Sequence, residues 1–218
     1  MSRKLRRKTY LGGAFCALAL SFLVSGPAHA AEPAAPTPDS EPNRIIYVDG
    51  PSPKPDNSAR VIQSDSNATV TVTEPEDLPV VPEPGETVRI IYTDAVTEIT
   101  TDPVVDSVGA RAGACTKSIT ANTPWKSSTQ ARASGSGTIS RGCGYGSTLR
   151  VHLYGGGVHR GDTSFSVPNN GSTFSTGFGR TCSNSNSTSH YVLSTWSSGG
   201  SAMSGTRTLA CGYGFWEW

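Results

Sequence analysis

The stretch Thr148-Leu149-Arg150-Val151-His152-Leu153-Tyr154 carries the clearest structural signal in the chain. Its apolar residues occupy every second position, and polar or amphipathic residues stand between them. This period of two is typical of a β-strand with one buried and one solvated face. The sequence therefore predicts a strand over residues 148–154. Leu149, Val151 and Leu153 are expected to face a core, and Arg150, His152 and Tyr154 are expected to face solvent.

Similar short patterns lie on both sides of this strand, separated by turns rich in Gly, Asn and Ser. Further strands are predicted over residues 117–121, 130–140, 163–167, 174–178, 191–196 and 207–211. About seven short strands in roughly 100 residues, with almost no helical signal, indicate an all-β fold. We expect a small antiparallel β-sandwich, Ig-like in strand number, over residues 112–218.

The first 30 residues have the pattern of a signal peptide. A basic start is followed by an apolar run over residues 11–24, and Ala28-His29-Ala30 supplies small residues for cleavage after Ala30. The apolar run is shorter than the roughly 20 residues that a membrane-spanning helix needs. We therefore expect a secreted protein whose mature form has no membrane span.

Four cysteines follow the leader: Cys115, Cys143, Cys182 and Cys211. In an exported chain they predict two disulfides, for which three pairings are possible. Cys115 and Cys143 are 28 positions apart, Cys182 and Cys211 are 29 apart, and Cys-Gly-Tyr-Gly occurs at both Cys143 and Cys211. This spacing favours Cys115 with Cys143 and Cys182 with Cys211. The closely spaced cysteine pairs of zinc sites are absent, so no metal site is expected.

The order of strands and cysteines in residues 115–218 resembles that of small exported β-sandwich proteins of unknown function from actinobacteria. The resemblance rests on Cys143-Gly144-Tyr145-Gly146, on residues 149–154 and on Gly179-Arg180-Thr181-Cys182. It implies a β-sandwich fold in a bacterial protein, and it implies no activity.

The charge changes sign near Arg111. Residues 31–110 hold 15 Asp and Glu against 4 Lys and Arg, whereas residues 111–218 hold 2 against 9. Residues 31–111 are also rich in proline and poor in aromatic residues, so we expect them to be largely extended or disordered. Three β-prone pieces, residues 44–49, 70–73 and 89–94, are expected to be isolated strands that seek a sheet edge. The acidic segment is either a propeptide cut near Arg111 or a permanent spacer.

Two groups of residues are candidates for binding. The first group is Arg150, His152 and Tyr154, on the solvated face of the central predicted strand. The Lys and Arg residues of this domain have few acidic neighbours, so the domain should have a positive electrostatic field that attracts polyanions. Trp216 and Trp218 would share one face of an extended strand and could form a ligand platform. The alternatives are that the cations only keep the domain soluble and that the tryptophans close the sandwich.

Catalysis is not expected. A hydrolase needs a base and an orienting acid beside a nucleophile, and residues 112–218 contain only Asp162 and Glu217 as carboxylates. We predict no catalytic residue and no cofactor. The expected function is non-catalytic binding at a cell surface or to extracellular polyanions such as cell-wall polymers, with the acidic segment as a partner in cis. The alternatives are a bacteriocin-like toxin and a protease inhibitor that presents residues 155–162.

Overall fold

The computed structural model describes residues 42–54, 59–64, 68–74, 78–103 and 114–214. These residues belong to one compact unit, Ala35–Trp218. They form fourteen β-strands and no helix, so the predicted all-β class is confirmed for the described part of the chain. The processing positions Ala30 and Arg111 and the tryptophans Trp216 and Trp218 lie outside the described residues.

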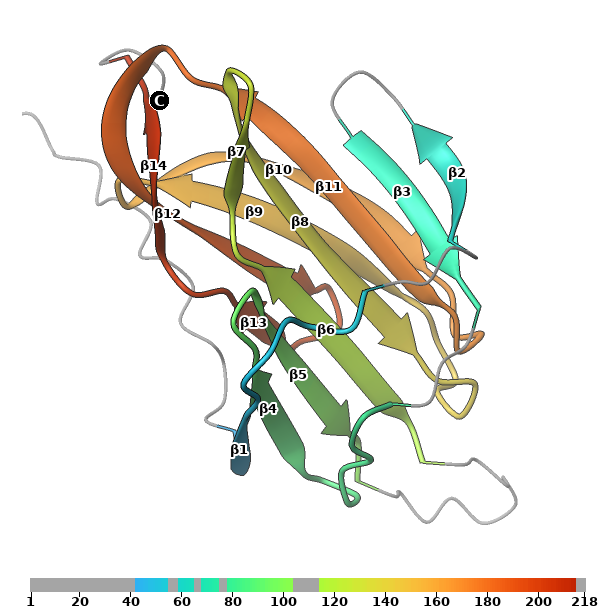
Figure 1. Cartoon of the computed structure of the whole chain (residues 1–218). Helices are drawn as coiled ribbons and strands as arrows, with labels where there is room; N and C mark the ends of the chain where they lie inside the picture. Colours follow the sequence, from blue (N-terminus) through green and yellow to red (C-terminus); the bar gives the residue numbers. More distant parts are fainter. Residues whose placement is uncertain (1–41, 55–58, 65–67, 75–77, 104–113, 215–218) are drawn as a thin grey trace, which may run out of the picture. The chain divides into compact units, whose positions relative to one another are not determined.

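The strands form two sheets that pack as a sandwich (Figure 1). The nine-stranded sheet has the order β1-β4-β5-β6-β8-β11-β3-β2, and β7 pairs with β8 beside β6. Its strands are β1 (Arg44–Tyr47), β2 (Arg60–Ser64), β3 (Ala68–Thr73), β4 (Thr87–Ile91), β5 (Ala95–Thr101), β6 (Thr116–Asn122), β7 (Trp125–Ser127), β8 (Gln130–Ile139) and β11 (Thr173–Thr181).

The five-stranded sheet has the order β10-β9-β12-β13, with β14 also paired to β12. Its strands are β9 (Ser147–Gly155), β10 (Val158–Val167), β12 (Asn184–Trp196), β13 (Ser201–Met203) and β14 (Arg207–Gly212). All seven strands predicted after residue 112 are confirmed. After residue 112 the sequence missed β7 and β13, which have three residues each and are too short to show an alternating pattern. Before residue 112 it missed β2 and β5.

The core lies between the two sheets. On β9, Leu149, Val151 and Leu153 are fully buried, as their alternation predicts. The facing strand β8 carries small residues at its core positions, and a Cβ on Gly137 would lie 2.4 Å from the ring of Trp196. The bulky indole of β12 therefore packs directly on the backbone of β8, and only glycine fits there.

Both disulfides have the predicted pairing. Cys115–Cys143 joins the start of β6 to the loop after β8, and Cys182–Cys211 joins the end of β11 to β14, which belongs to the other sheet. The second disulfide is therefore a covalent link between the two sheets.

The acidic segment differs from the prediction that it is largely extended or disordered. Its described residues include β1 to β5, and all five strands belong to the nine-stranded sheet. The predicted edge-seeking pieces are confirmed: β3 pairs with β11, and the two near-copies, residues 44–49 and 89–94, contribute β1 and β4, which pair in parallel. Composition predicts disorder because the acidic segment alone cannot bury enough apolar surface to fold. In the structure, β6 and β11 of the basic part provide strands for β5 and β3 to pair with.

Side chains also join the acidic segment to the basic part of the chain. The ammonium group of Lys117 on β6 lies 3.1 Å from Asp102 Oδ1 and 3.2 Å from Tyr145 Oη, and Tyr145 donates a hydrogen bond of 3.0 Å to Asp102 Oδ2. The pKa of Lys117 is raised: burial alone would lower it, but the bonds to Tyr145 and Asp102 outweigh burial. These three side chains form a partly buried contact between a residue before the change in charge and two residues after it.

A second ion pair lies within the acidic segment itself. Arg89 on β4 donates from Nε to Glu98 Oε1 on β5 over 2.8 Å, and the side chain of Glu98 is only 6% exposed. Burial raises the pKa of Glu98, although the hydrogen bond and the charge of Arg89 act in the opposite direction. The guanidinium of Arg89 therefore stabilises the charged form of the buried Glu98 carboxylate.

No helix in the described residues is long and apolar enough to cross a membrane.

We predict that replacing Cys182 and Cys211 together with serine lowers the free energy of unfolding by about 2–4 kcal/mol, because the two sheets lose their covalent link and the unfolded chain gains freedom. Denaturant unfolding of the variant and of the parent protein measures this difference. The matched check is alkylation of the unreduced parent, in which none of the four cysteines should react. Labelling of any of them would contradict the pairing.

We predict that Arg89→Met lowers the free energy of unfolding by about 3–5 kcal/mol at neutral pH, because Glu98 is left buried and charged without a partner. Since the folded-state pKa of Glu98 is already raised and rises further in the variant, the loss should shrink as the pH falls from neutral toward about 4. It should be smallest below about 4, where the carboxyl is protonated in both the folded and the unfolded state. Denaturant unfolding at several pH values measures both effects.

The control is Arg44→Met, the equivalent position in the other near-copy. Arg44 forms an ion pair with Glu86, but its side chain is 49% exposed, so the change should cost less than about 1 kcal/mol. Equal losses in the two variants would show that the Arg89–Glu98 pair is not special.

Candidate functional site

The structure brings together the three predicted binding residues of β9. Arg150, His152 and Tyr154 lie on the outer face of the five-stranded sheet, as the alternation predicts. Tyr154 is only 9% exposed, because its ring stacks on Tyr191 of β12 with 4.7 Å between the centroids and 3° between the planes. Burial of their own side chains raises the pKa of Tyr154 and Tyr191, and burial of His152 lowers the pKa of its imidazole.

The positive field of this face is weaker than the sequence suggests. Arg150 Nε lies 3.4 Å from Asp162 Oδ2, so the cation on the predicted binding face has an anionic partner on the next strand. Outside this face, Lys126 on β7 donates to the carbonyl of Ala210, and Arg141 after β8 donates to the carbonyl of Asn170. Among the described basic residues after residue 114, Arg132, Arg180 and Arg207 form no ion pair. These three remain the candidates for contact with an anionic ligand.

Residues 155–162, considered above as an inhibitory loop, form no projecting loop. Gly155 ends β9, Gly156 and Gly157 make the turn with positive φ angles of 65° and 82°, and β10 begins at Val158. The hairpin is tight, so most of this segment is engaged in backbone pairing.

A deeper feature lies on the outer face of the nine-stranded sheet, and sequence analysis did not identify it. It is a groove of about 490 Å³, which we call the hydroxyl groove. Its floor is made by the outward side chains of β5, β6, β8 and β11, and nearly all of them carry a hydroxyl or an amide. They are Thr97, Ser118, Thr120, Asn122, Ser134, Ser136, Thr138, Thr173 and Ser175.

The floor is ordered by strand register. Thr97, Thr120, Ser136 and Ser175 are successive cross-strand neighbours on four strands, so they form one row of hydroxyls across the sheet. Ser118, Thr138 and Thr173 form a second row. Adjacent members of a row are separated by the strand spacing of about 4.8 Å. The result is a regular grid of polar groups rather than a random polar surface.

Hydrogen bonds within the grid fix some of these side chains. Thr97 and Thr120 share a hydrogen bond of 2.9 Å between their Oγ1 atoms, Asn122 Nδ2 donates to Ser134 Oγ over 2.9 Å, and Thr138 and Thr173 share a bond of 2.7 Å. Each hydroxyl has one donor and two acceptor positions, so a single bond leaves capacity for a ligand.

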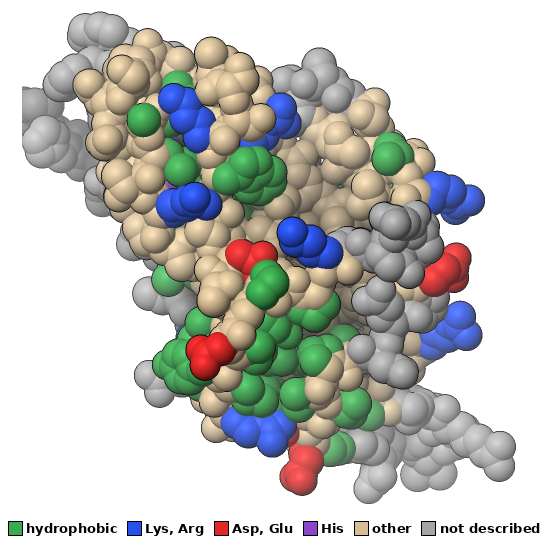
Figure 2. Space-filling model, viewed as in Figure 1, with side chains coloured by type: hydrophobic (Ala, Val, Ile, Leu, Met, Phe, Trp, Pro, Cys, Tyr) green, Lys and Arg blue, Asp and Glu red, His purple; other side chains and the backbone are tan. Residues whose placement is uncertain are grey.

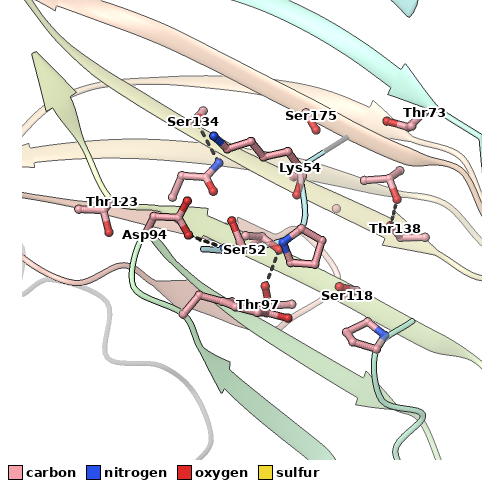
Figure 3. Close-up of a pocket in the computed structure, with 18 of the residues that line it drawn as sticks. Ser52, Lys54, Thr73, Asp94, Thr97, Ser118, Thr123, Ser134, Thr138 and Ser175 are labelled. Carbon is pink, nitrogen blue, oxygen red and sulfur yellow. Dashed lines mark hydrogen bonds between the residues drawn. The ribbon is translucent and has the colours of Figure 1, made fainter. Parts of the chain in front are cut away.

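One wall of the groove is a segment of the acidic part of the chain (Figure 3). Ser52, Pro53 and Lys54 line it, and the Lys54 side chain extends over the polar floor. The segment is held by Asp94, whose Oδ1 accepts a hydrogen bond of 2.6 Å from the backbone N–H of Ser52. Leu78, Pro79 and Tyr92 add apolar surface on the side where β4 and β5 lie.

An aromatic residue and a cation stand at the β7 end. Trp125 lines the groove and is 39% exposed, an unusual exposure for a tryptophan. Arg132 is its cross-strand neighbour on β8 and lies two positions before Ser134, so it faces the same side of the sheet. Figure 2 shows this face, with Lys and Arg side chains scattered over its upper part and hydrophobic side chains gathered around β4 and β5.

The arrangement can hold a ligand that offers many hydroxyl groups. The floor supplies both donors and acceptors, Trp125 supplies a flat apolar surface, and Lys54 supplies a positive charge. Among the residues of the groove that the structure describes, Asp94 is the one carboxylate, and its Oδ1 accepts a hydrogen bond from the backbone N–H of Ser52.

Comparison of the chain with known protein families, curated proteins and solved structures finds no match, so the site must be interpreted from its own geometry.

Proposed function

We propose that the protein is an exported, non-catalytic binding protein that holds a cell-surface glycan in the hydroxyl groove. The observation that carries this proposal is the double row of hydroxyl side chains on an outer sheet face, open to solvent and confined between walls. Solubility alone requires only polar side chains at the surface, and it does not require Ser and Thr hydroxyls to be aligned in rows within a groove.

Glycans match this surface in two respects. Their hydroxyls both donate and accept hydrogen bonds, which suits a floor of Ser, Thr and Asn side chains. Their rings also have flat apolar faces, which pack on exposed aromatic side chains such as Trp125. A long apolar ligand, in contrast, would bury the floor hydroxyls without hydrogen-bond partners.

The charges around the groove favour a glycan with anionic substituents, such as an acidic cell-wall polymer. Lys54 lines the groove, and Arg132 lies on β8 two positions before the floor residue Ser134. Asp94, the one carboxylate among the described lining residues, accepts a hydrogen bond from the backbone of Ser52. This proposal retains the expected polyanionic partner and moves its binding site from Arg150, His152 and Tyr154 to the opposite sheet.

Export rests on two observations. Residues 1–30 have the pattern of a signal peptide, and the described chain contains two disulfides, which persist in oxidising compartments. Binding without catalysis is proposed because the described lining of the groove contains no pair of carboxylates and no histidine. The toxin and inhibitor functions stay predictions that no observation on the described residues favours.

We predict that Trp125→Ala weakens binding to purified acidic cell-wall polysaccharide at least about fivefold, because the loss of one stacking surface removes about 1 kcal/mol or more. Isothermal titration of the exported protein with polysaccharide measures the affinity. β7 has only three residues and Trp125 is exposed, so thermal unfolding should be nearly unchanged.

Tyr47→Ala is the matched control, since Tyr47 is an aromatic residue with 75% exposure that does not line the groove. It should leave binding unchanged.

Lys54→Gln with Arg132→Gln should reduce the dependence of affinity on salt, because fewer exposed charges contact the ligand. Equal binding by Trp125→Ala and Tyr47→Ala, or no binding by the parent protein, would overturn the proposal.

A further inference from the structure

Two histidines and an aspartate meet on the outer face of the five-stranded sheet, and the hydroxyl groove does not involve them. His152 lies on β9, and His159 and Asp162 lie on β10. One ligand atom from each residue can be chosen so that all three lie within 4.8 Å of one another. His152 Nδ1 is 3.3 Å from His159 Nε2, and His159 Nε2 is 3.9 Å from Asp162 Oδ1.

A β-bulge creates this cluster. His159 and Asp162 are three residues apart, so in a regular strand they would point to opposite faces of the sheet. The register of β10 against β9 shifts by one residue between His159 and Gly161, which places His159 opposite Tyr154 and Asp162 opposite His152. Bulges of this kind re-aim side chains, and they occur frequently beside functional sites.

Gly161 makes the bulge possible. Its φ angle is +149°, a region that residues with a side chain rarely adopt. A Cβ there would also lie 3.2 Å from the ring of Phe178 in the core. The glycine allows the strand to turn Asp162 toward His152 while the core on the other side remains packed.

The three side chains match the ligand preferences of Zn²⁺ and related transition-metal ions. Imidazole nitrogens and carboxylate oxygens bind zinc at about 2.0–2.2 Å, so neighbouring ligand atoms of a tetrahedral site are about 3.3 Å apart. The two histidine nitrogens already have this separation. The side chains of His159 and Asp162 are 43% and 36% exposed, so the small movement that brings them closer meets little resistance.

The surroundings orient the carboxylate of Asp162 toward His159 and favour the neutral form of the His152 ring. Asp162 turns Oδ2 toward Arg150 Nε, at 3.4 Å, and this leaves Oδ1 on the side of His159. Partners of this kind orient metal-binding carboxylates. Burial is the main cause that lowers the pKa of His152, so its ring is neutral, as a metal ligand must be, over more of the physiological range.

From this geometry we propose that His152, His159 and Asp162 form a binding site for a divalent transition-metal ion of the Zn²⁺ class. Three protein ligands leave a fourth position open on the exposed side of the sheet. A bound ion there would add positive charge to a face whose one cation on β9, Arg150, is otherwise balanced by Asp162.

Titration of the exported protein with ZnCl₂ by calorimetry at about pH 7.5 tests the proposal, because metal affinity requires deprotonated ligands. We expect one saturable site with micromolar affinity. His152→Ala, His159→Ala and Asp162→Asn should each weaken it at least about 100-fold, the upper end of what loss of an outer partner costs. The control Glu83→Gln, which removes an exposed carboxylate elsewhere, should bind zinc as the parent does.

The groups that face the cluster also fix the expected pH dependence. They are Arg150 and Tyr154 on β9 and Tyr191 on β12. Burial raises the pKa of both phenols, so they stay neutral across the acidic range. Affinity should therefore fall as the pH is lowered from about 7.5 to 5.5, because metal binding requires deprotonated ligands.

A second measurement needs no variant. Zn²⁺ should shift the imidazole resonances of His152 and His159 in NMR spectra of the parent protein and leave those of His190 in place. His190 is a built-in control, because it is fully buried and its ring nitrogens lie 2.8 Å from Thr188 O and 3.0 Å from Tyr213 Oη. No zinc binding, binding that all variants retain, or equal shifts of all three histidines would overturn the proposal. The 3.3 Å contact would then be a histidine–histidine hydrogen bond alone.

Discussion

Backbone pairing between β5 (Ala95–Thr101) and β6 (Thr116–Asn122) is the contact on which the rest of the nine-stranded sheet depends. Seven consecutive residue pairs join these strands, and hydroxyl contacts between Thr97 and Thr120 and between Thr101 and Thr116 reinforce the pairing. Because β5 precedes the change in charge and β6 follows it, this pairing unites the acidic and the basic parts of the chain in one fold. Without it, β6 would present an unpaired edge, and β4 and β1 would have no sheet to extend.

The hydroxyl groove is a consequence of the same pairing. Its floor needs β5, β6, β8 and β11 in register, and its wall needs residues 52–54, which Asp94 fixes at the turn before β5. The acidic segment thus supplies a strand of the floor and a side of the groove. If that segment were released as a propeptide, the groove would be dismantled, so the proposed glycan function favours a segment that stays in place.

Sequence reasoning predicts what depends on local pattern and fails where distant strands set the result. The alternation in residues 148–154 predicts β9 and its buried Leu149, Val151 and Leu153, and cysteine spacing predicts both disulfides. In the acidic segment the sequence predicts the strand pieces that become β1, β3 and β4, but not β2 or β5. It does not predict the pairing of β5 with β6 or of β3 with β11, because each pair joins residues that are distant in sequence. The groove is hidden for the same reason: its Ser and Thr residues look like ordinary solvated strand positions until register aligns them. The cluster at His152 depends on one bulge at Gly161, which no period-two pattern shows.

Amide hydrogen exchange of the native protein, followed by mass spectrometry, tests the central claim most directly. If the acidic and basic parts form one sheet, peptides covering β5 and β6 should exchange slowly and with similar protection, since each strand protects the other's amides. Rapid exchange throughout residues 42–101, beside full protection of residues 116–212, would contradict the account. It would show that the C-terminal strands fold without the acidic segment, which would then be the disordered propeptide or spacer that its composition suggests.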